Sequence, residues 1–157
     1  MIRPMRAEDK HIVMSFIRET GFFTADEIKV AEELIDIYLN DHGQSDYRIV
    51  VIENESGQTV GYLTWGPTPL AEDAYDLYWM AVSPAAQGKG FGKELMRWVE
   101  AEISSLDGRL IIIETSSQPK YQPTREFYSK LGYREVARVP DFYRPGDDRI
   151  IYVKNMI

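Results

Sequence analysis

The chain has 157 residues, a formal net charge of −7, two histidines and no cysteine. This length predicts one domain, over residues 1–157, that can bury a sizeable hydrophobic core. The negative charge argues against a nucleic-acid partner, which needs clustered lysine and arginine. The lack of cysteine excludes disulfides, thiolate metal sites and a cysteine-linked acyl intermediate, and two histidines give no basis for a metal site.

Hydropathy adds an expectation about location. No apolar stretch approaches the roughly 20 residues that a membrane-spanning helix needs. The first residues carry no apolar core of a signal peptide, so we expect a cytoplasmic protein with no membrane partner.

The negative charge is concentrated in the first third of the chain. Between Glu19 and Asp46 the sequence has eight acidic residues and one basic residue, Lys29. The commoner interpretation is a solvated helix face. The alternative is an acidic wall that steers a cationic ligand.

The first half of the chain is predicted to form a strand, two helices and a β-hairpin. Thr24 and Glu27 form a capping-box pattern, which begins the second helix. Apolar residues at spacings of three and four follow it, as in a helix with one buried face. The strand is expected at residues 2–6, the two helices at residues 7–20 and from residue 24 on, and the hairpin strands at residues 47–53 and 59–65.

The second half is predicted to alternate strands and helices. Residues 109–116 are almost continuously apolar, which is typical of a strand covered on both faces. Gly132 is placed to end the preceding helix in a left-handed conformation. The expected ranges are strand 75–82, helix 90–105, strand 109–116, helix 123–131, and strands 133–139 and 149–154 around a turn at 144–147. The order β-α-α-β-β-β-α-β-α-β-β predicts an α/β fold with a mixed sheet and helices on both faces.

A glycine-rich loop joins strand 75–82 to the helix that follows it. Such a loop leaves backbone N–H groups free at the positive end of a helix, which suits a phosphate. It is not a phosphate-binding loop of the Walker type, because neither Gly-Lys pair is followed by Ser or Thr. Gly88, Gly90 and the later carboxylate Glu114 partly fit a dinucleotide fingerprint, but its third glycine position falls on Lys93. A nicotinamide or flavin enzyme is therefore a weaker alternative.

The loop and a second segment resemble the GNAT family of N-acetyltransferases. Gln87, Gly90 and Gly92 fit the family's Gln-x-x-Gly-x-Gly acetyl-CoA loop, and they follow Val-Ser-Pro at 82–84. Residues 127–133 resemble the family's Phe-Tyr-x-x-x-Gly-Phe/Tyr segment. Both motifs lie within residues 75–133, whereas the first 70 residues match only in the order of their elements.

The resemblance implies the GNAT fold and acetyl-CoA as the acetyl donor. The loop would hold the pyrophosphate, and the backbone near Met80 would pair with the pantetheine arm. One N–H at or near Met80 would face the thioester oxygen. The implied cofactor-binding residues are Met80, Ala81, Val82, Gln87, Gly88, Lys89, Gly90, Phe91, Gly92 and Lys93.

The resemblance also assigns catalytic roles. Tyr128 occupies the position of the family's general acid, and a phenol is protonated at neutral pH. A substrate ammonium must lose a proton before attack, through a carboxylate or a water chain. Glu114 is the first choice for this base, with Asp76, Glu72 and Asp73 as alternatives.

One departure from the family concerns the pantetheine arm. Tyr121 and Thr124 stand where members commonly have Asn and Ala, so the family's contact of that Asn with the pantetheine does not carry over, and Tyr121 is instead a candidate for lining the channel. The acceptor pocket is expected to form from the first two helices, the loop at 66–75 and residues 141–144. Its candidate aromatic walls are Phe22, Phe23, Trp65, Trp79 and Tyr143.

The sequence therefore predicts an N-acetyltransferase. It would move the acetyl group of acetyl-CoA directly to a small-molecule or peptide primary amine, in a ternary complex and without a metal. The alternative is a non-catalytic module that senses acyl-CoA. A homodimer through the last strands is compatible with the sequence but not required by it.

Overall fold

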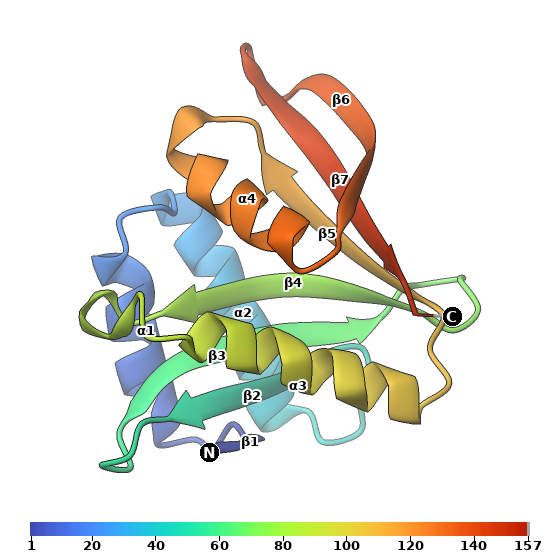
Figure 1. The fold of residues 1–157 in the computed structure, drawn as a ribbon. Coiled ribbons are helices and arrows are strands. Elements are labelled where there is room, and N and C mark those ends of the chain that lie inside the picture. The colour runs from blue at the N-terminus through green and yellow to red at the C-terminus, as the bar shows by residue number, and fades with distance from the viewer. Residues whose placement is uncertain (157) are drawn as a thin grey trace.

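The elements follow the predicted order in the computed structural model, which describes residues 1–156 (Figure 1). The capping box at Thr24 begins the second helix, and Gly132, at φ +94°, follows the last one, both as predicted. The strands are β1 (Ile2–Pro4), β2 (Arg48–Glu53), β3 (Thr59–Pro67), β4 (Ala74–Val82), β5 (Leu110–Ser116), β6 (Arg134–Arg144) and β7 (Asp147–Asn155). The helices are α1 (Asp9–Glu19), α2 (Ala25–Asn40), α3 (Phe91–Ser105) and α4 (Gln122–Lys130), with short 3₁₀ turns η1 (Pro84–Ala86) and η2 (Pro119–Tyr121).

The strands form one sheet, in the order β1-β2-β3-β4-β5-β7-β6. Between residues 1 and 156, β4 and β5 make the one parallel pair, and the other neighbours are antiparallel. The predicted mixed α/β sheet is confirmed.

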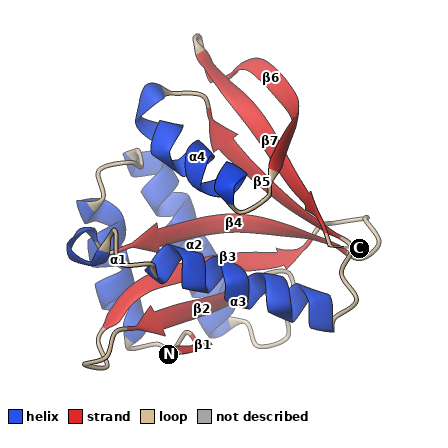
Figure 2. Ribbon diagram, in the orientation of Figure 1, coloured by secondary structure: helices blue, strands red, loops and turns tan. Residues whose placement is uncertain are grey.

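Helices cover both faces of the sheet and divide the hydrophobic core in two (Figure 2). On one face, α1 and α2 pack through residues such as Phe16 and Ile35 against β2, β3 and β4. On the other face, α3 packs through Leu95 and Val99, together with Tyr128 of α4. The strands of the sheet centre are buried from both sides, which explains their apolar runs.

The parallel strands β4 and β5 separate along their length, as Figure 1 shows. Their pairing ends where Leu77 meets Ile113, yet β4 continues to Val82. On its other side, β4 pairs Trp79 with Thr64 but Leu77 with Trp65, so Tyr78 is the extra residue of a β-bulge. The bulge and the separation leave the end of β4 without a strand partner on its β5 side.

Several predicted bounds need correction, most of all those of the last two strands. β6 was expected at residues 133–139 but runs to Arg144, directly before the turn at Pro145 and Gly146. A register shift between Val139 and Arg144, with Asp141 at φ +56°, absorbs the irregular segment and lets the strand continue. β7 is likewise longer than predicted. The first strand ends at Pro4, and α1 begins at Asp9, later than expected.

No helix within residues 1–156 combines the length and the apolar character needed to cross a membrane.

Candidate active site

The glycine-rich loop presents free backbone amides at the start of α3. Gly88 and Gly90 have φ of +78° and +89°, a conformation that favours glycine. The first hydrogen bond of the helix runs from Glu94 N to Gly90 O, at 3.0 Å. The amides of residues 91–93 precede that bond and so have no partner within the helix. Unpaired amides at the positive end of a helix dipole are suited to an anion.

A hydrogen bond ties the loop to the end of β4. The Gln87 side-chain amide donates to the Val82 carbonyl at 3.2 Å. A Cβ at Gly92 would lie 3.6 Å from the Phe127 ring, so α4 lies close to this turn of α3. Lys89 and Lys93 line a broader groove between α3 and the turn that joins β2 to β3.

A narrow cavity of about 30 Å³ lies where β4 and β5 separate. It brings together three predicted site residues from different elements, namely Met80 of β4, Glu114 of β5 and Tyr128 of α4. Val82 packs with the core on the α3 side, whereas Ala81 is buried among residues of α1 and α2. The cavity is lined by Leu63, Leu77, Tyr78, Trp79, Met80, Met96, Ile113, Glu114 and Tyr128.

Tyr128 is buried, with 8% of its surface exposed. Its ring packs against Phe127 and Tyr133, with centroids 5.6 Å and 6.0 Å away. Burial raises the pKa of Tyr128 to about 12, so the phenol stays protonated through the neutral range. No group within residues 1–156 forms a hydrogen bond with its hydroxyl, which is free to donate to a ligand in the cavity.

The carboxylates proposed as base occupy different positions. Glu114 lines the cavity and forms an ion pair with Arg149 of β7. Asp76 lies opposite Ile112, where β4 and β5 are still paired, and accepts a 3.4 Å hydrogen bond from the Tyr78 hydroxyl. Burial raises the pKa of Asp76, and the charge of Glu114 acts in the same direction.

Three other predicted residues are not brought to the cavity. Glu72 and Asp73 are exposed just before β4 begins, at the end of the strand opposite to the separation. Trp65, expected as a pocket wall, is 2% exposed in the core, with the Arg48 guanidinium 4.8 Å from its ring centroid.

Sequence reasoning missed Tyr78 and Arg149. Tyr78 reaches the cavity lining through the β-bulge, and its ring meets Tyr47 edge-on at 5.4 Å. Burial, with the charge of Asp76, raises the pKa of Tyr78 to about 12. Arg149 reaches Glu114 because β7 pairs with β5, and no local motif carries that information.

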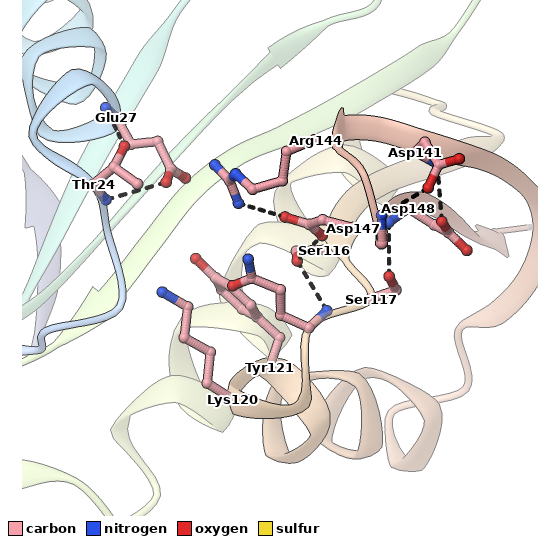
Figure 3. A network of polar contacts seen from close by, with 12 residues as sticks. Thr24, Glu27, Ser116, Ser117, Lys120, Tyr121, Asp141, Arg144, Asp147 and Asp148 are labelled. Carbon is pink, nitrogen blue, oxygen red and sulfur yellow. Dashed lines mark hydrogen bonds and ion pairs between the residues drawn. The ribbon is translucent and has the colours of Figure 1, made fainter.

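A polar network secures the end of β5 (Figure 3). Asp147 is 3% exposed and accepts hydrogen bonds from Ser116 and from Arg144, the latter at 2.6 Å. Ser116 in turn accepts from Gln118 N at 3.0 Å. The β6–β7 turn is thus attached to the segment that leads into α4.

Within residues 1–156, no three His, Asp or Glu side chains gather as metal ligands would.

A family model described as acetyltransferase (GNAT) domain matches residues 45–135, more than half of the chain. The chain belongs to the GNAT family. A GNAT-family protein from Desulfovibrio desulfuricans is 39% identical, with a TM-score of 0.93 over 100% of this chain and 99% of that one. Comparison with curated proteins gives no match.

More distant GNAT structures share the fold. An aminoglycoside 6′-N-acetyltransferase in complex with coenzyme A is 19% identical, with a TM-score of 0.76 over 100% of this chain and 97% of its own. The Escherichia coli ribosomal-protein-S18-alanine N-acetyltransferase is 17% identical, with a TM-score of 0.73 over 99% of this chain and 93% of its own. Membership makes this GNAT protein an acyltransferase and removes the nicotinamide or flavin alternative.

Proposed function

We propose that this enzyme transfers the acetyl group of acetyl-CoA directly to a primary amine. The observation that carries the proposal is the free hydroxyl of Tyr128 in the cavity between β4 and β5. Because this hydroxyl forms no hydrogen bond within residues 1–156, it is available to donate to a ligand that enters the cavity. The free amides at the start of α3 lie next to the end of the same strand, β4.

The donor would bind in two parts. Its pyrophosphate would accept hydrogen bonds from the amides of residues 91–93 and from the loop around Gly88 and Gly90. Its pantetheine arm would pair with β4 between Met80 and Val82, where β5 has moved away. A backbone N–H near Met80 would then face the thioester oxygen, and one such donor is worth roughly 3 kcal/mol in the transition state.

The chemistry would use two side chains in sequence. Glu114 accepts one proton from the substrate ammonium, which makes the nitrogen nucleophilic. The nitrogen attacks the thioester carbon, and the C–S bond breaks as the amide forms. Tyr128 donates its proton to the departing thiolate, and the second proton lost by the nitrogen restores the phenol. Direct transfer fits a chain without cysteine.

The acceptor is expected to be a small-molecule or peptide amine. The relatives compared above are named for an aminoglycoside and for a protein alanine, so the fold accommodates both kinds. Release of CoA thiol, measured against a panel of primary amines with mass spectrometry of the products, tests the proposal. Thiol release together with an acetylated amine supports it. Thiol release that is independent of any amine contradicts it.

The protonation states predict the pH dependence. Because the pKa of Tyr128 is raised to about 12, the acid stays protonated, and kcat should not fall between pH 7 and 10.

Glu114→Gln should lower kcat/KM about 10²-fold at pH 7. That deficit should shrink toward pH 10, where solvent alone supplies neutral amine. Asp76→Asn is the matched variant. If Asp76→Asn, and not Glu114→Gln, has a lowered kcat/KM at pH 7 that recovers toward pH 10, the base is Asp76 rather than Glu114.

A further inference from the structure

The loop between α1 and α2 contacts both β4 and the η2 turn that follows β5. We call residues 20–24 the strap. The ring of Phe23 meets Trp79 edge-on at 5.3 Å, on the part of β4 that has left β5. The ring of Phe22 packs on Tyr121 at 5.8 Å, in η2, shortly after β5 ends. The strap therefore spans from the β4 side of the separation to the β5 side.

The β5 side of the strap is fastened by two donors on one carbonyl. The Phe22 carbonyl accepts a hydrogen bond from the Tyr121 hydroxyl at 3.0 Å and one from Lys120 Nζ at 2.8 Å. The Lys120 ammonium also lies 5.4 Å from the centroid of the Tyr121 ring. Figure 3 shows both side chains directed toward the start of α2, where Thr24 and Glu27 lie.

Both ends of the strap are anchored in helices. Thr20 donates to the Ile17 carbonyl at 2.8 Å, and Gly21 ends α1 with φ of +71°. At the other end, Thr24 and Glu27 exchange capping hydrogen bonds of 3.2 Å and 3.1 Å. The helices therefore fix where the strap begins and ends, and Tyr121 and Lys120 fix its position against η2.

The strap also touches the lining of the cavity. Trp79, on which Phe23 packs, lines the cavity together with Glu114 and Tyr128. A shift of the strap away from η2 would therefore change the space beside the residues that we propose as base and acid.

We propose that Tyr121 and Lys120 determine acceptor specificity by holding the strap across the acceptor side of the separated strands. Because the cavity that Trp79 lines has a volume of only about 30 Å³, the strap in this position would admit a slender, unbranched primary amine and exclude an amino group on a bulky ring system or a folded protein surface. This inference rests on the proposed function and names its acceptor class. Both residues act by positioning the strap and take no part in the chemistry.

The double variant Tyr121→Phe with Lys120→Ala tests the inference, because it removes both hydrogen bonds and keeps the aromatic ring. Tyr38→Phe and Lys130→Ala are matched controls on α2 and at the end of α4. The first readout is hydrogen exchange of the strap, which should become faster in the double variant alone.

The second readout is the ratio of kcat/KM for hexylamine to that for 1-adamantylamine. Wild type should favour hexylamine, and the double variant should reduce that preference roughly tenfold through KM for the amine, with KM for acetyl-CoA unchanged. The inference would be overturned if wild type had equal kcat/KM values for the two amines, or if the double variant kept the wild-type ratio. Either result would leave the proposed function standing. Failure of wild type to turn over any amine would instead be a failure of the proposed function.

Discussion

Tyr128→Phe should bind acetyl-CoA with unchanged affinity and turn over about 10²- to 10⁴-fold more slowly, the usual contribution of a general acid. The variant keeps the ring that packs against Phe127 and Tyr133 and loses only a hydroxyl that has no protein partner within residues 1–156. The fold should therefore tolerate it, with little change in melting temperature. Steady-state kinetics with the best amine of the panel, beside an acetyl-CoA titration, measures both quantities.

Tyr133→Phe is the matched control for this prediction. Tyr133 is also a buried residue, but its hydroxyl donates to Glu100 of α3 at 3.0 Å. Because the acceptor is a carboxylate, loss of that bond should cost about 2 kcal/mol of unfolding free energy and leave kcat nearly unchanged. Unchanged turnover in Tyr128→Phe would remove this residue from the mechanism, and would favour a role for the fold in sensing acyl-CoA.

Gly90→Asp should weaken acetyl-CoA binding by about 10²- to 10³-fold. The new carboxylate would stand at the start of α3, where we place the pyrophosphate, and like charges about 4 Å apart repel by several kcal/mol near a protein surface. A Cβ at Gly90 meets no atom within 4 Å, so the substitution strains only the backbone, at φ +89°.

Gly57→Asp provides the control, measured by the same titration. Gly57 has φ of +77° and equally open surroundings, but it lies in the turn between β2 and β3. The two variants carry the same added charge and a similar backbone strain. An equal loss of affinity in both would show that the effect does not come from the loop.

The order of elements and the conformation of the glycine-rich loop were predictable because their signals are local. The capping box at Thr24, the helix end at Gly132 and the glycines of the loop each act through neighbouring backbone groups. The parallel pairing of β4 with β5 follows from the helix between them. The same locality explains why the sequence placed Tyr128 and Glu114 on the right elements.

The remaining features depend on contacts between distant segments. The separation of β4 from β5 and the bulge at Tyr78 arise from pairing registers on both sides of β4, which no window of sequence contains. Arg149 meets Glu114 only because β7 enters the sheet beside β5. Tyr121 was noted as a departure from the family, but its bond to Phe22 joins residues 99 positions apart. The extension of β6 past Val139 likewise depends on its pairing with β7.

A thermal-shift titration of the purified, ligand-free protein with acetyl-CoA, CoA and NAD tests whether the protein binds the proposed acetyl donor. Ligand at 100 times Kd stabilises the folded state by about 2.7 kcal/mol, which raises Tm by several degrees for a domain of this size. We expect Tm to rise with acetyl-CoA and with CoA and to stay unchanged with NAD. No response to either CoA species would contradict both the donor site and the acetyl transfer built on it.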